Sequence, residues 1–563
     1  MSQAPITARF GHSFTPALAP AARPAPAKAR AMAPGPSSRG AYPLSSAYPY
    51  QAASLVDPEL GDWFPQIRSP DAEINQHRDR MVARQRDHIR NDGLASGGIA
   101  KILDQTVGSR LRYQALPDYR ALARATGITA FDAVWANDFR QAAEAQWRMF
   151  ADDQGRYADV ERQQSVSQFW RLQLRHKLVD GDSVTMSYWL PERMGRGRAR
   201  FATAFKAIDP DRLSNPYQQQ DTRYMRGGIE IDDDDAAIAY WIRKAQPNDW
   251  YAGMDQMTWE RVLREDDDGW RRVIHDFDRE RTGQHRGLGV FAPVLGRAKM
   301  LATAYRLELQ ASALQSSIGT YLTSPYDPSS VEDAISGNDE LSTYQAIRKD
   351  WSNERPAFFG DLQVPSLAPG EDIKTISATH PHSGFPEFAH EMQASLASAL
   401  GLTLEQFNQR WKDMNYSNAR GSFMDTWKTL VRRRQDFEQN TAGPMVTVWM
   451  HEPMERGDLP LPAGAPDYIE YRTEYSRAAF LGPARGWLDP VKEPQGAVLE
   501  MDAGLSTLAD SSSDQGRDWE ETLDQRAIEV QGFKDRGLEV PSWAALNVPA
   551  NQAAQPQSVE DAK

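Results

Sequence analysis

A cluster of histidine and acidic residues is one of two places in this sequence where side chains could bind a metal. The stretch "HPHSGFPEFAHEM" contains His380, His382, His390 and Glu391. A zinc-protease helix requires a second histidine four residues after the first, on the same face. That position is Ala394 here, and the other two histidines precede the helix, on either side of Pro381. We therefore expect capping or interface contacts from these residues, and no metal site.

A second group of possible metal ligands is the acidic run that begins at Glu230 and continues from Asp232 to Asp235. These carboxylates could hold calcium or magnesium, but the spacing of an EF-hand loop is absent. The run lies where two apolar segments must be joined. We expect the solvated tip of a hairpin there, and the same for "EDDDG" at residues 265–269.

Other recognisable catalytic patterns are missing. The chain has no cysteine, which excludes disulfides, thiolate nucleophiles and cysteine-ligated zinc or iron–sulfur sites. We find no P-loop, no Rossmann fingerprint and no Gly-x-Ser-x-Gly elbow. We therefore predict no catalytic residues, no metal and no cofactor. In a chain of 563 residues, this absence favours a structural or assembly role over an enzyme.

Length and charge narrow the class of protein further. The chain is long enough for several domains, carries a formal net charge of −13 and has a mean hydropathy of −0.63. No run approaches the roughly 18 apolar residues of a membrane helix, so we expect no membrane contact. The acidic balance argues against a protein that coats nucleic acid through bulk charge, but it permits local contacts.

The two ends of the chain differ in composition from the middle. Residues 1–50 contain five basic residues and no acidic residue, and residues 16–36 come close to an Ala/Pro repeat. Such segments cannot bury enough apolar surface to fold. We expect a disordered basic arm over residues 1–50 and a disordered tail over residues 541–563.

Apolar periodicity predicts helices on both sides of a strand-rich region. One helical pattern runs from Asp71 to Gly108, and a second runs from Ala130 to Leu174. The expected core positions are Ile89, Ile99, Ile102, Leu103 and Val107 in the first, and Trp135, Trp147, Phe150, Phe169 and Trp170 in the second. Short β-branched and aromatic runs over residues 180–275 predict antiparallel strands.

Two long helices are expected to bracket a small insertion. The first begins near Pro293 and extends to Thr323, with Val294, Ala298, Leu301, Tyr305 and Leu309 on one side. Turn-rich residues 324–383 follow, and a second helix from Gly384 to Leu400 ends at Gly401. Its apolar stripe is formed by Phe385, Phe388, Met392, Leu396 and Leu400.

The C-terminal part begins with a capping box in "TLEQ", residues 403–406. The polar loop "MNYSN" comes next, and Ser417 is expected to cap a helix that ends in Arg432, Arg433 and Arg434. Residues 445–475 have a strand-like composition, and the chain to Leu538 is helical and rich in charge.

This order of elements resembles the portal proteins of tailed bacteriophages, and six motifs are similar to the lambda-type portal family. They are "RDHIRNDGLASGGIAKILDQTVGS" from Arg86, "GIE" with "IAYWI" from Gly228, "RTGQHRGLGVFAPVL" from Arg281, "HSGFPEFAHEMQASLASALGL" from His382, "NYSNARGSFMDTW" from Asn415 and "GWLDPVKE" from Gly486. No single motif would suffice, but six in the family's order, between Arg86 and about Leu538, make the resemblance specific.

The resemblance implies an α+β, predominantly helical portal fold, in a ring of usually twelve copies at one capsid vertex. Double-stranded DNA is packaged and ejected through its channel, and terminase large subunit and then the head-tail connector dock on it. Capsid and scaffold proteins are further expected partners, in a virion assembled in the host cytoplasm. The implied regions are a wing (51–290), stem helices (291–323 and 384–401), a clip (324–383), a tunnel loop with a long helix and the second wing part (402–495), and a crown (496–540).

The resemblance also implies a DNA-facing loop over residues 414–421. The expected DNA-facing residues are Lys412, Asn415, Tyr416, Ser417, Asn418 and Arg420, which could touch the phosphate backbone without reading bases. For Arg432 to Arg434 we favour contacts with neighbouring subunits over contacts with DNA. The loop departs from the family pattern, which more often has a second serine and an alanine, and the basic arm is unusually long.

Two other classes of function remain open at this point. A metal-dependent hydrolase or maturation enzyme would use His380, His382 and Asp232 to Asp235. A minor head or scaffold-binding protein would lack a channel.

Overall fold

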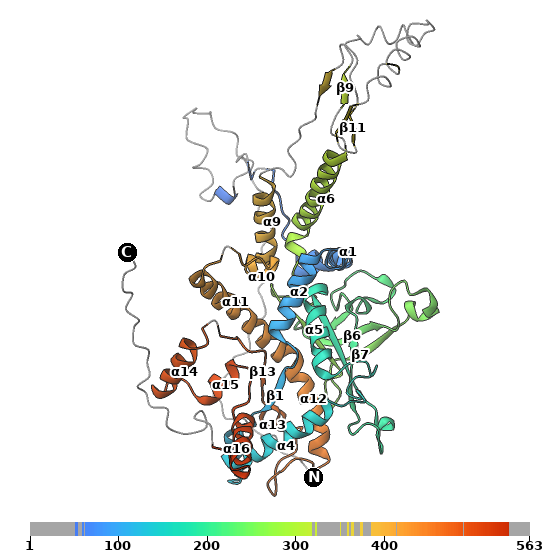
Figure 1. Ribbon diagram of the computed structural model, residues 1–563. Coiled ribbons are helices and arrows are strands. Elements are labelled where there is room, and N and C mark those ends of the chain that lie inside the picture. The colour runs from blue at the N-terminus through green and yellow to red at the C-terminus, as the bar shows by residue number, and fades with distance from the viewer. Residues whose placement is uncertain are drawn as a thin grey trace, which may run out of the picture. The chain divides into compact units, whose positions relative to one another are not determined.

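The structure is a computed structural model that describes residues 51–53, 59–60, 62–317, 321–323, 350, 357–359, 362–364, 372–374, 384–412, 414–487 and 489–539. The chain divides into two units, residues 1–67 and residues 68–563. The helices, sheets and clefts below belong to the second unit (Figure 1). The expected arm (1–50), the expected tail (541–563) and most of the expected clip (324–383) lie outside the described residues.

The first half of this unit contains helices around two antiparallel sheets. The helices are α1 (Pro70–Asn91), α2 (Gly93–Thr106), α3 (Tyr119–Thr126), α4 (Ala133–Ala151) and α5 (Val166–Asp180). The strands are β1 (Arg112–Ala115), β2 (Asp182–Trp189), β3 (Thr203–Ile208), β4 (Met225–Arg226), β5 (Ile229–Ile231), β6 (Ala237–Arg243), β7 (Trp259–Leu263) and β8 (Val273–Phe277).

The expected helical patterns are present, but each is broken once. The first run breaks at Asp92, whose carboxylate accepts hydrogen bonds from Leu94 N and Ala95 N at 2.8 and 3.1 Å and so caps α2. The second run breaks into α4 and α5 at a turn-rich segment over residues 152–165. All ten expected core residues are nevertheless buried, because the periodicity reports the buried face and not the helix ends.

The predicted antiparallel strands are confirmed over residues 180–275. One sheet has the order β3-β2-β8, and the other has the order β4-β5-β6-β7. The acidic run forms the β5–β6 turn, as expected, where Asp232 Oδ1 accepts hydrogen bonds from Asp234 N and Ala236 N at 2.9 and 2.8 Å. This carboxylate therefore shapes the turn.

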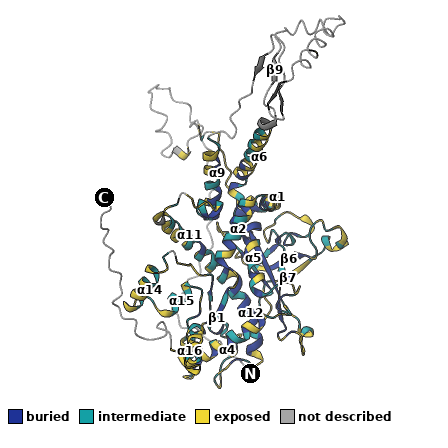
Figure 2. Ribbon diagram, in the orientation of Figure 1, coloured by how far each residue is buried: buried dark blue, intermediate teal, exposed yellow. Residues whose placement is uncertain are grey.

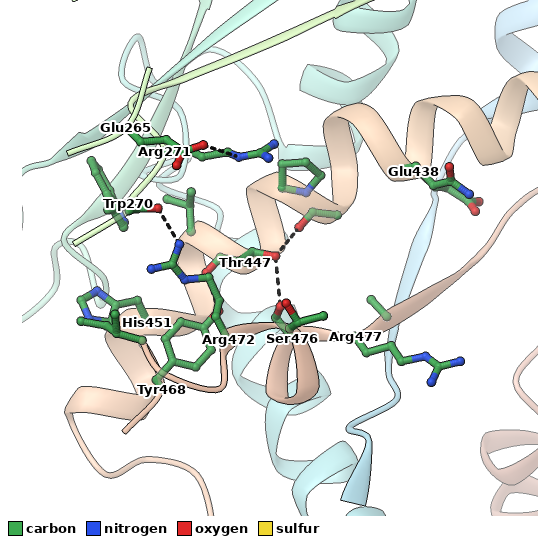
Figure 3. A pocket seen from close by; sticks show the side chains of 18 of the residues that line it. Glu265, Trp270, Arg271, Glu438, Thr447, His451, Tyr468, Arg472, Ser476 and Arg477 are labelled. Carbon is green, nitrogen blue, oxygen red and sulfur yellow. Dashed lines mark hydrogen bonds and ion pairs between the residues drawn. The ribbon is translucent and has the colours of Figure 1, made fainter. Parts of the chain in front are cut away.

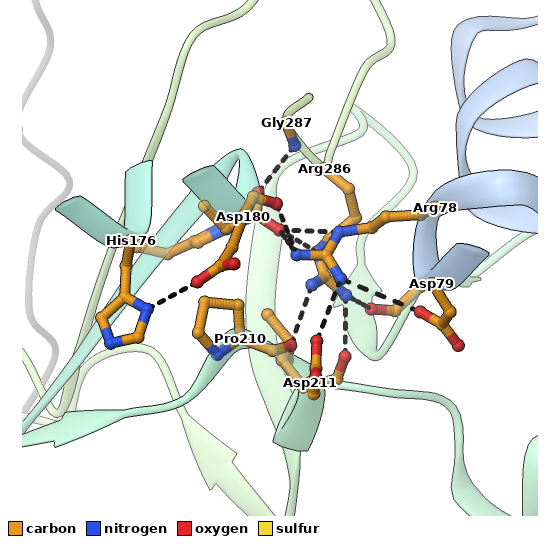
Figure 4. A network of polar contacts seen from close by, with 12 residues as sticks. Arg78, Asp79, His176, Asp180, Pro210, Asp211, Arg286 and Gly287 are labelled. Atoms are coloured by element: carbon orange, nitrogen blue, oxygen red, sulfur yellow. Dashed lines mark hydrogen bonds and ion pairs between the residues drawn. The ribbon is translucent and has the colours of Figure 1, made fainter. Parts of the chain in front are cut away.

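A network of buried charges joins α1 to the three-stranded sheet (Figure 4). Arg78 and Arg286 both bind Asp182 Oδ2, through Nη2 at 2.8 Å and through Nε at 2.7 Å. Gly287 N donates to Asp182 Oδ1 at 2.6 Å, and His275 lies 3.3 Å from the same atom. Gly181, at φ +89°, allows this approach, since a Cβ there would lie 2.5 Å from the carbonyl of Gly287.

The expected pair of long helices is present, with shorter bounds. The first is α6 (Leu295–Ser317), preceded by a 3₁₀ turn (Ala292–Val294), and the second is α9 (Phe385–Leu400). They run antiparallel, because Arg297 contacts Ser395 near one end and Tyr305 contacts Phe385 near the other (Figure 1). Residues 321–323, predicted to extend the first helix, form β9 (Tyr321–Thr323), paired with β12 (Asp372–Lys374). The insertion also holds β10 (Ala357–Phe359) and β11 (Leu362–Val364), which pair with each other.

The expected apolar stripes of these helices are only partly buried. Leu309 and Phe388 are exposed. The sequence predicted which residues share one side of each helix, and it did not predict what covers that side.

The strand-like prediction for residues 445–475 is wrong. A nearly continuous helical path runs through α11 (Tyr416–Phe437), a π-helical turn η8 (Glu438–Ala442) and α12 (Gly443–Glu455), and α13 (Arg472–Ser476) follows. Met445, Val446, Val448, Trp449 and Met450 are all buried. A short, continuous apolar run of this kind cannot be told from a buried strand by periodicity alone.

The C-terminal helices are α14 (Lys492–Asp502), α15 (Leu508–Asp514) and α16 (Trp519–Asp535). None of them contains a buried residue, whereas α2, α5 and α12 are largely buried (Figure 2). The expected crown boundary at residue 496 falls inside α14. Before these helices, β13 (Ala478–Leu481) pairs antiparallel with β1.

Candidate functional site

The expected DNA-facing segment lies at the junction between α10 (Leu404–Asn408) and α11. The predicted capping box of α10 is present, between Thr403 and Gln406. Asn415, not Ser417, caps α11, because its side chain accepts a hydrogen bond from Asn418 N at 2.9 Å. The predicted polar loop over residues 414–421 is therefore mostly the first turns of a helix.

The six expected site residues fall on two sides of this cap. Lys412 precedes it, Asn415 forms it, and the remaining residues Tyr416, Ser417, Asn418 and Arg420 lie in α11. Lys412, Asn415, Ser417, Asn418 and Arg420 are exposed, and the side chain of Tyr416 lies outside the described residues. The segment thus presents a polar surface with two cationic side chains.

An aromatic contact that we did not predict fixes the geometry of this junction. Trp411 stacks on Phe423, with 5.6 Å between ring centroids and 14° between ring planes. Gln409 ends α10 in the left-handed region, at φ +57°. The signal available in the sequence was a tryptophan directly before the polar loop, with a phenylalanine on the following helix.

We had expected the three arginines at the end of α11 to share one role, but they do not. Arg432 pairs with Asp436 at 2.7 Å on the surface. Arg434 donates to the carbonyls of Thr106, Gln105 and Pro483 at 3.0, 2.9 and 3.2 Å and lies over the Trp427 ring. Arg434 therefore joins α2 and the segment after β13 to α11 within one chain, which corrects the prediction that it serves neighbouring subunits.

The residues considered for metal binding do not come together in the described part of the chain. His390 and Glu391 are exposed on α9, while His380 and His382 lie outside the described residues. Within the described ranges, no group of three or more His, Cys, Asp or Glu side chains is placed to hold a metal ion. None of the described helices is long and apolar enough to cross a lipid bilayer.

Comparison with known proteins identifies relatives over most of the chain. Residues 57–434 match the family model described as phage portal protein, lambda family. The chain is 30% identical over 495 residues to the portal protein of Escherichia phage N15, covering 86% of this chain and 90% of the relative. It is 29% identical over 513 residues to portal protein B of Escherichia phage lambda, covering 90% and 93%.

A comparison of structures finds weaker likeness. A chain from the neck of an empty gene transfer agent particle aligns with a TM-score of 0.40 and 11% identity, covering 78% of this chain and 93% of that one. The assignment therefore rests on the sequence matches. By the family match and the coverage of its relatives, this chain belongs to the lambda family of phage portal proteins.

Proposed function

We propose that copies of this chain form a closed ring, expected to contain twelve, at one vertex of a phage capsid. Its central channel is the conduit through which double-stranded DNA is packaged and later ejected. The observation that carries this proposal is the lambda-family portal match over residues 57–434. The protein acts as a structural conduit for DNA, without catalytic activity or a cofactor of its own.

The regions of the ring follow the order of the chain. Residues 51–290 and the second part of 402–495 form the wing, the helices within 291–323 and 384–401 form the stem, and residues 324–383 form the clip. The crown comprises residues 492–540, because α14 begins at Lys492. The clip meets terminase large subunit and then the head-tail connector, while the wing and crown meet capsid and scaffold proteins. The ring is part of the virion and is assembled in the host cytoplasm.

We assign the DNA-facing surface to Lys412, Asn415, Tyr416, Ser417, Asn418 and Arg420. Each cation that contacts a phosphate releases counterions and adds affinity, which would hold back a moving duplex. Only Lys412 and Arg420 of these six residues are cationic, and the neutral ones can contact phosphate oxygens without sequence preference. Such a surface can contact the passing DNA while binding it only weakly.

Electron microscopy of the purified chain tests the ring. We expect closed rings with a central hole, and a particle mass near a multiple of 63.2 kDa by light scattering. A monodisperse monomer at high concentration, in several salts, would refute the proposal.

Crosslinking in DNA-filled heads tests the DNA-facing assignment. A photo-crosslinking residue at Ser417, in rings of DNA-filled heads, should crosslink to DNA, and one at the wing residue Asp234 should not. Crosslinking at Asp234 alone would contradict the assignment and leave the ring proposal intact.

A further inference from the structure

A cleft of about 960 Å³ opens beside the π-helical turn in the long helix (Figure 3). The end of α11, the turn η8 and the start of α12 form one wall. The turn after β7 and the segment from α13 to β13 form the rest. The cleft lies within residues 68–563 and is separate from the expected DNA-facing residues.

The arginines that line this cleft are already engaged. Arg271 pairs with Glu265 at 3.5 Å, and Arg477 pairs with Asp118 at 3.3 Å. Arg472 donates to the carbonyls of Gly269 and Asp268 at 2.5 and 2.6 Å. The cleft therefore contains cations, but each one has its own acceptors.

Among the acidic groups that line the cleft, Glu438 is distinguished by burial. Its Oε1 is buried and has no hydrogen-bond partner among the described residues. Arg434, one helical turn earlier, could reach it, but its guanidinium is directed to three backbone carbonyls on other segments. Burial raises the pKa of Glu438 to about 7 despite the charge of Arg434. A buried acceptor without a donor destabilises the chain until a donor arrives.

The π-helical turn explains why this carboxylate stands at the edge of the cleft. Pro444 has no backbone N–H, and its ring would collide with the carbonyl four residues earlier in a regular helix. The helix widens instead, and Gly443 N bonds to the Glu438 carbonyl. Single π-helical turns of this kind often occur at functional sites. "AGP", residues 442–444, thus fixes the position of Glu438 through the backbone.

We propose that this cleft receives a lysine or arginine side chain from the neighbouring copy in the ring, and that this side chain donates a hydrogen bond to Glu438. The inference rests on the proposed ring. In a cyclic assembly one surface of each copy meets a different surface of the next, so every cleft is filled by the same residue of its neighbour. A cation is the donor that fits best, because its charge stabilises the ionised form of this carboxyl, and the arginines of the cleft already have acceptors within the chain.

The variant Glu438→Gln separates this role from a structural one. Removing a buried, unpaired carboxylate should leave the unfolding midpoint of the isolated chain unchanged or raised. The same change should weaken ring assembly about tenfold or more, measured by mass photometry over a dilution series. The matched control is Glu455→Gln on α12, whose carboxyl lies 3.8 Å from His451 and outside the cleft lining. It should alter assembly by less than twofold.

Crosslinking identifies the occupant directly. Thr473 is exposed and lines the cleft, so a photo-crosslinking residue there should yield covalent dimers whose partner peptide contains lysine or arginine. Crosslinks only within one chain, or only to a head-tail connector protein, would overturn the inference. Rings of unchanged affinity in Glu438→Gln would overturn it while leaving the proposed function intact. If the unmodified chain forms no ring, both proposals fail.

Discussion

Arginine–carboxylate pairs stabilise two separate regions of this chain. In one region the pairs are buried, and in the other they are exposed to solvent. Around Asp182, two arginines and a histidine meet a carboxylate whose side chain is 0% exposed. At the start of α16, Arg112 and Arg148 meet Glu521, whose side chain is 49% exposed. The first region joins α1 to a sheet, and the second attaches the C-terminal helix to β1 and α4.

The attachment of α16 depends on these exposed pairs and on a partly buried pair between Arg140 and Glu520. Arg112 and Arg148 bind Glu521 at 2.7 and 2.8 Å, and Arg140 binds Glu520. Asp518, which caps the helix, accepts a hydrogen bond from Gln114 and is buried. Beyond this cap, α16 contains no buried residue.

The difference indicates which parts of the chain can separate. Breaking a buried pair leaves a charge without water or partner, which costs several kcal/mol, so α1 and the sheet move as one body. Exposed pairs are each worth about 0–1 kcal/mol and are screened by salt. The C-terminal helix can therefore leave its place without unfolding the rest.

The largest effect is expected for Asp182→Ala. The change leaves Arg78 and Arg286 buried without their shared carboxylate, and we expect a loss of about 3–5 kcal/mol in the free energy of unfolding. Chemical denaturation followed by tryptophan fluorescence measures it. The control is Asp79→Ala, which removes a carboxylate 3.9 Å from Arg78 with a side chain that is 98% exposed, and it should cost less than about 0.5 kcal/mol. Equal losses in both variants would refute the distinction.

Much of the fold could be predicted because amphipathic helices and short strands leave periodic patterns. The aromatic core residues of α4 and α5 were found in this way, and so was the antiparallel region. The method failed at α12, since the short apolar run from Met445 to Met450 is compatible with a buried strand as well as with a helix. It also missed the break at Asp92, where one side chain decides the end of one helix and the start of the next.

The place of the polar segment that contains the expected DNA-facing residues could be predicted from the sequence, but its conformation could not. Its place after α10 followed from the capping box and the polar residues, whereas the choice of Asn415 over Ser417 as the cap depends on local geometry. The role of Arg434 could not be seen, because its acceptor Thr106 lies 328 residues away in sequence. Glu438 was missed for the same reason, since its burial arises from tertiary packing.

A smaller effect is expected when the attachment of α16 is weakened. In the double variant Glu520→Gln, Glu521→Gln the ion pairs with three arginines are lost, for about 1–2 kcal/mol of local stability. Hydrogen exchange of α16 amides should accelerate, while that of α1 amides should not change. Raising sodium chloride to about 1 M should have the same effect on the unmodified chain.

The matched control for this double variant is Glu529→Gln, which lies farther along α16 and contacts Gln525 in the same helix. It should leave the exchange of α16 unchanged. Acceleration in α1 as well would mean that the two regions unfold together, and the comparison would fail.

The smallest expected effect is a pH dependence of the same attachment, through Glu144 on α4. The pKa of this carboxyl is raised to about 7 by burial and by the charge of Asp518, against the opposing charge of Arg140. A carboxyl whose pKa is raised in the folded state destabilises that state progressively as pH rises from its ordinary pKa to the raised one. The ionised Glu144 then repels Asp518 at the start of α16.

Hydrogen exchange measures this effect. After correction for intrinsic rates, hydrogen exchange of the α16 amides should be several-fold faster at pH 8 than at pH 6, and Glu144→Gln should abolish that difference. A difference that persists in Glu144→Gln would assign the pH dependence to another group and refute the role of Glu144.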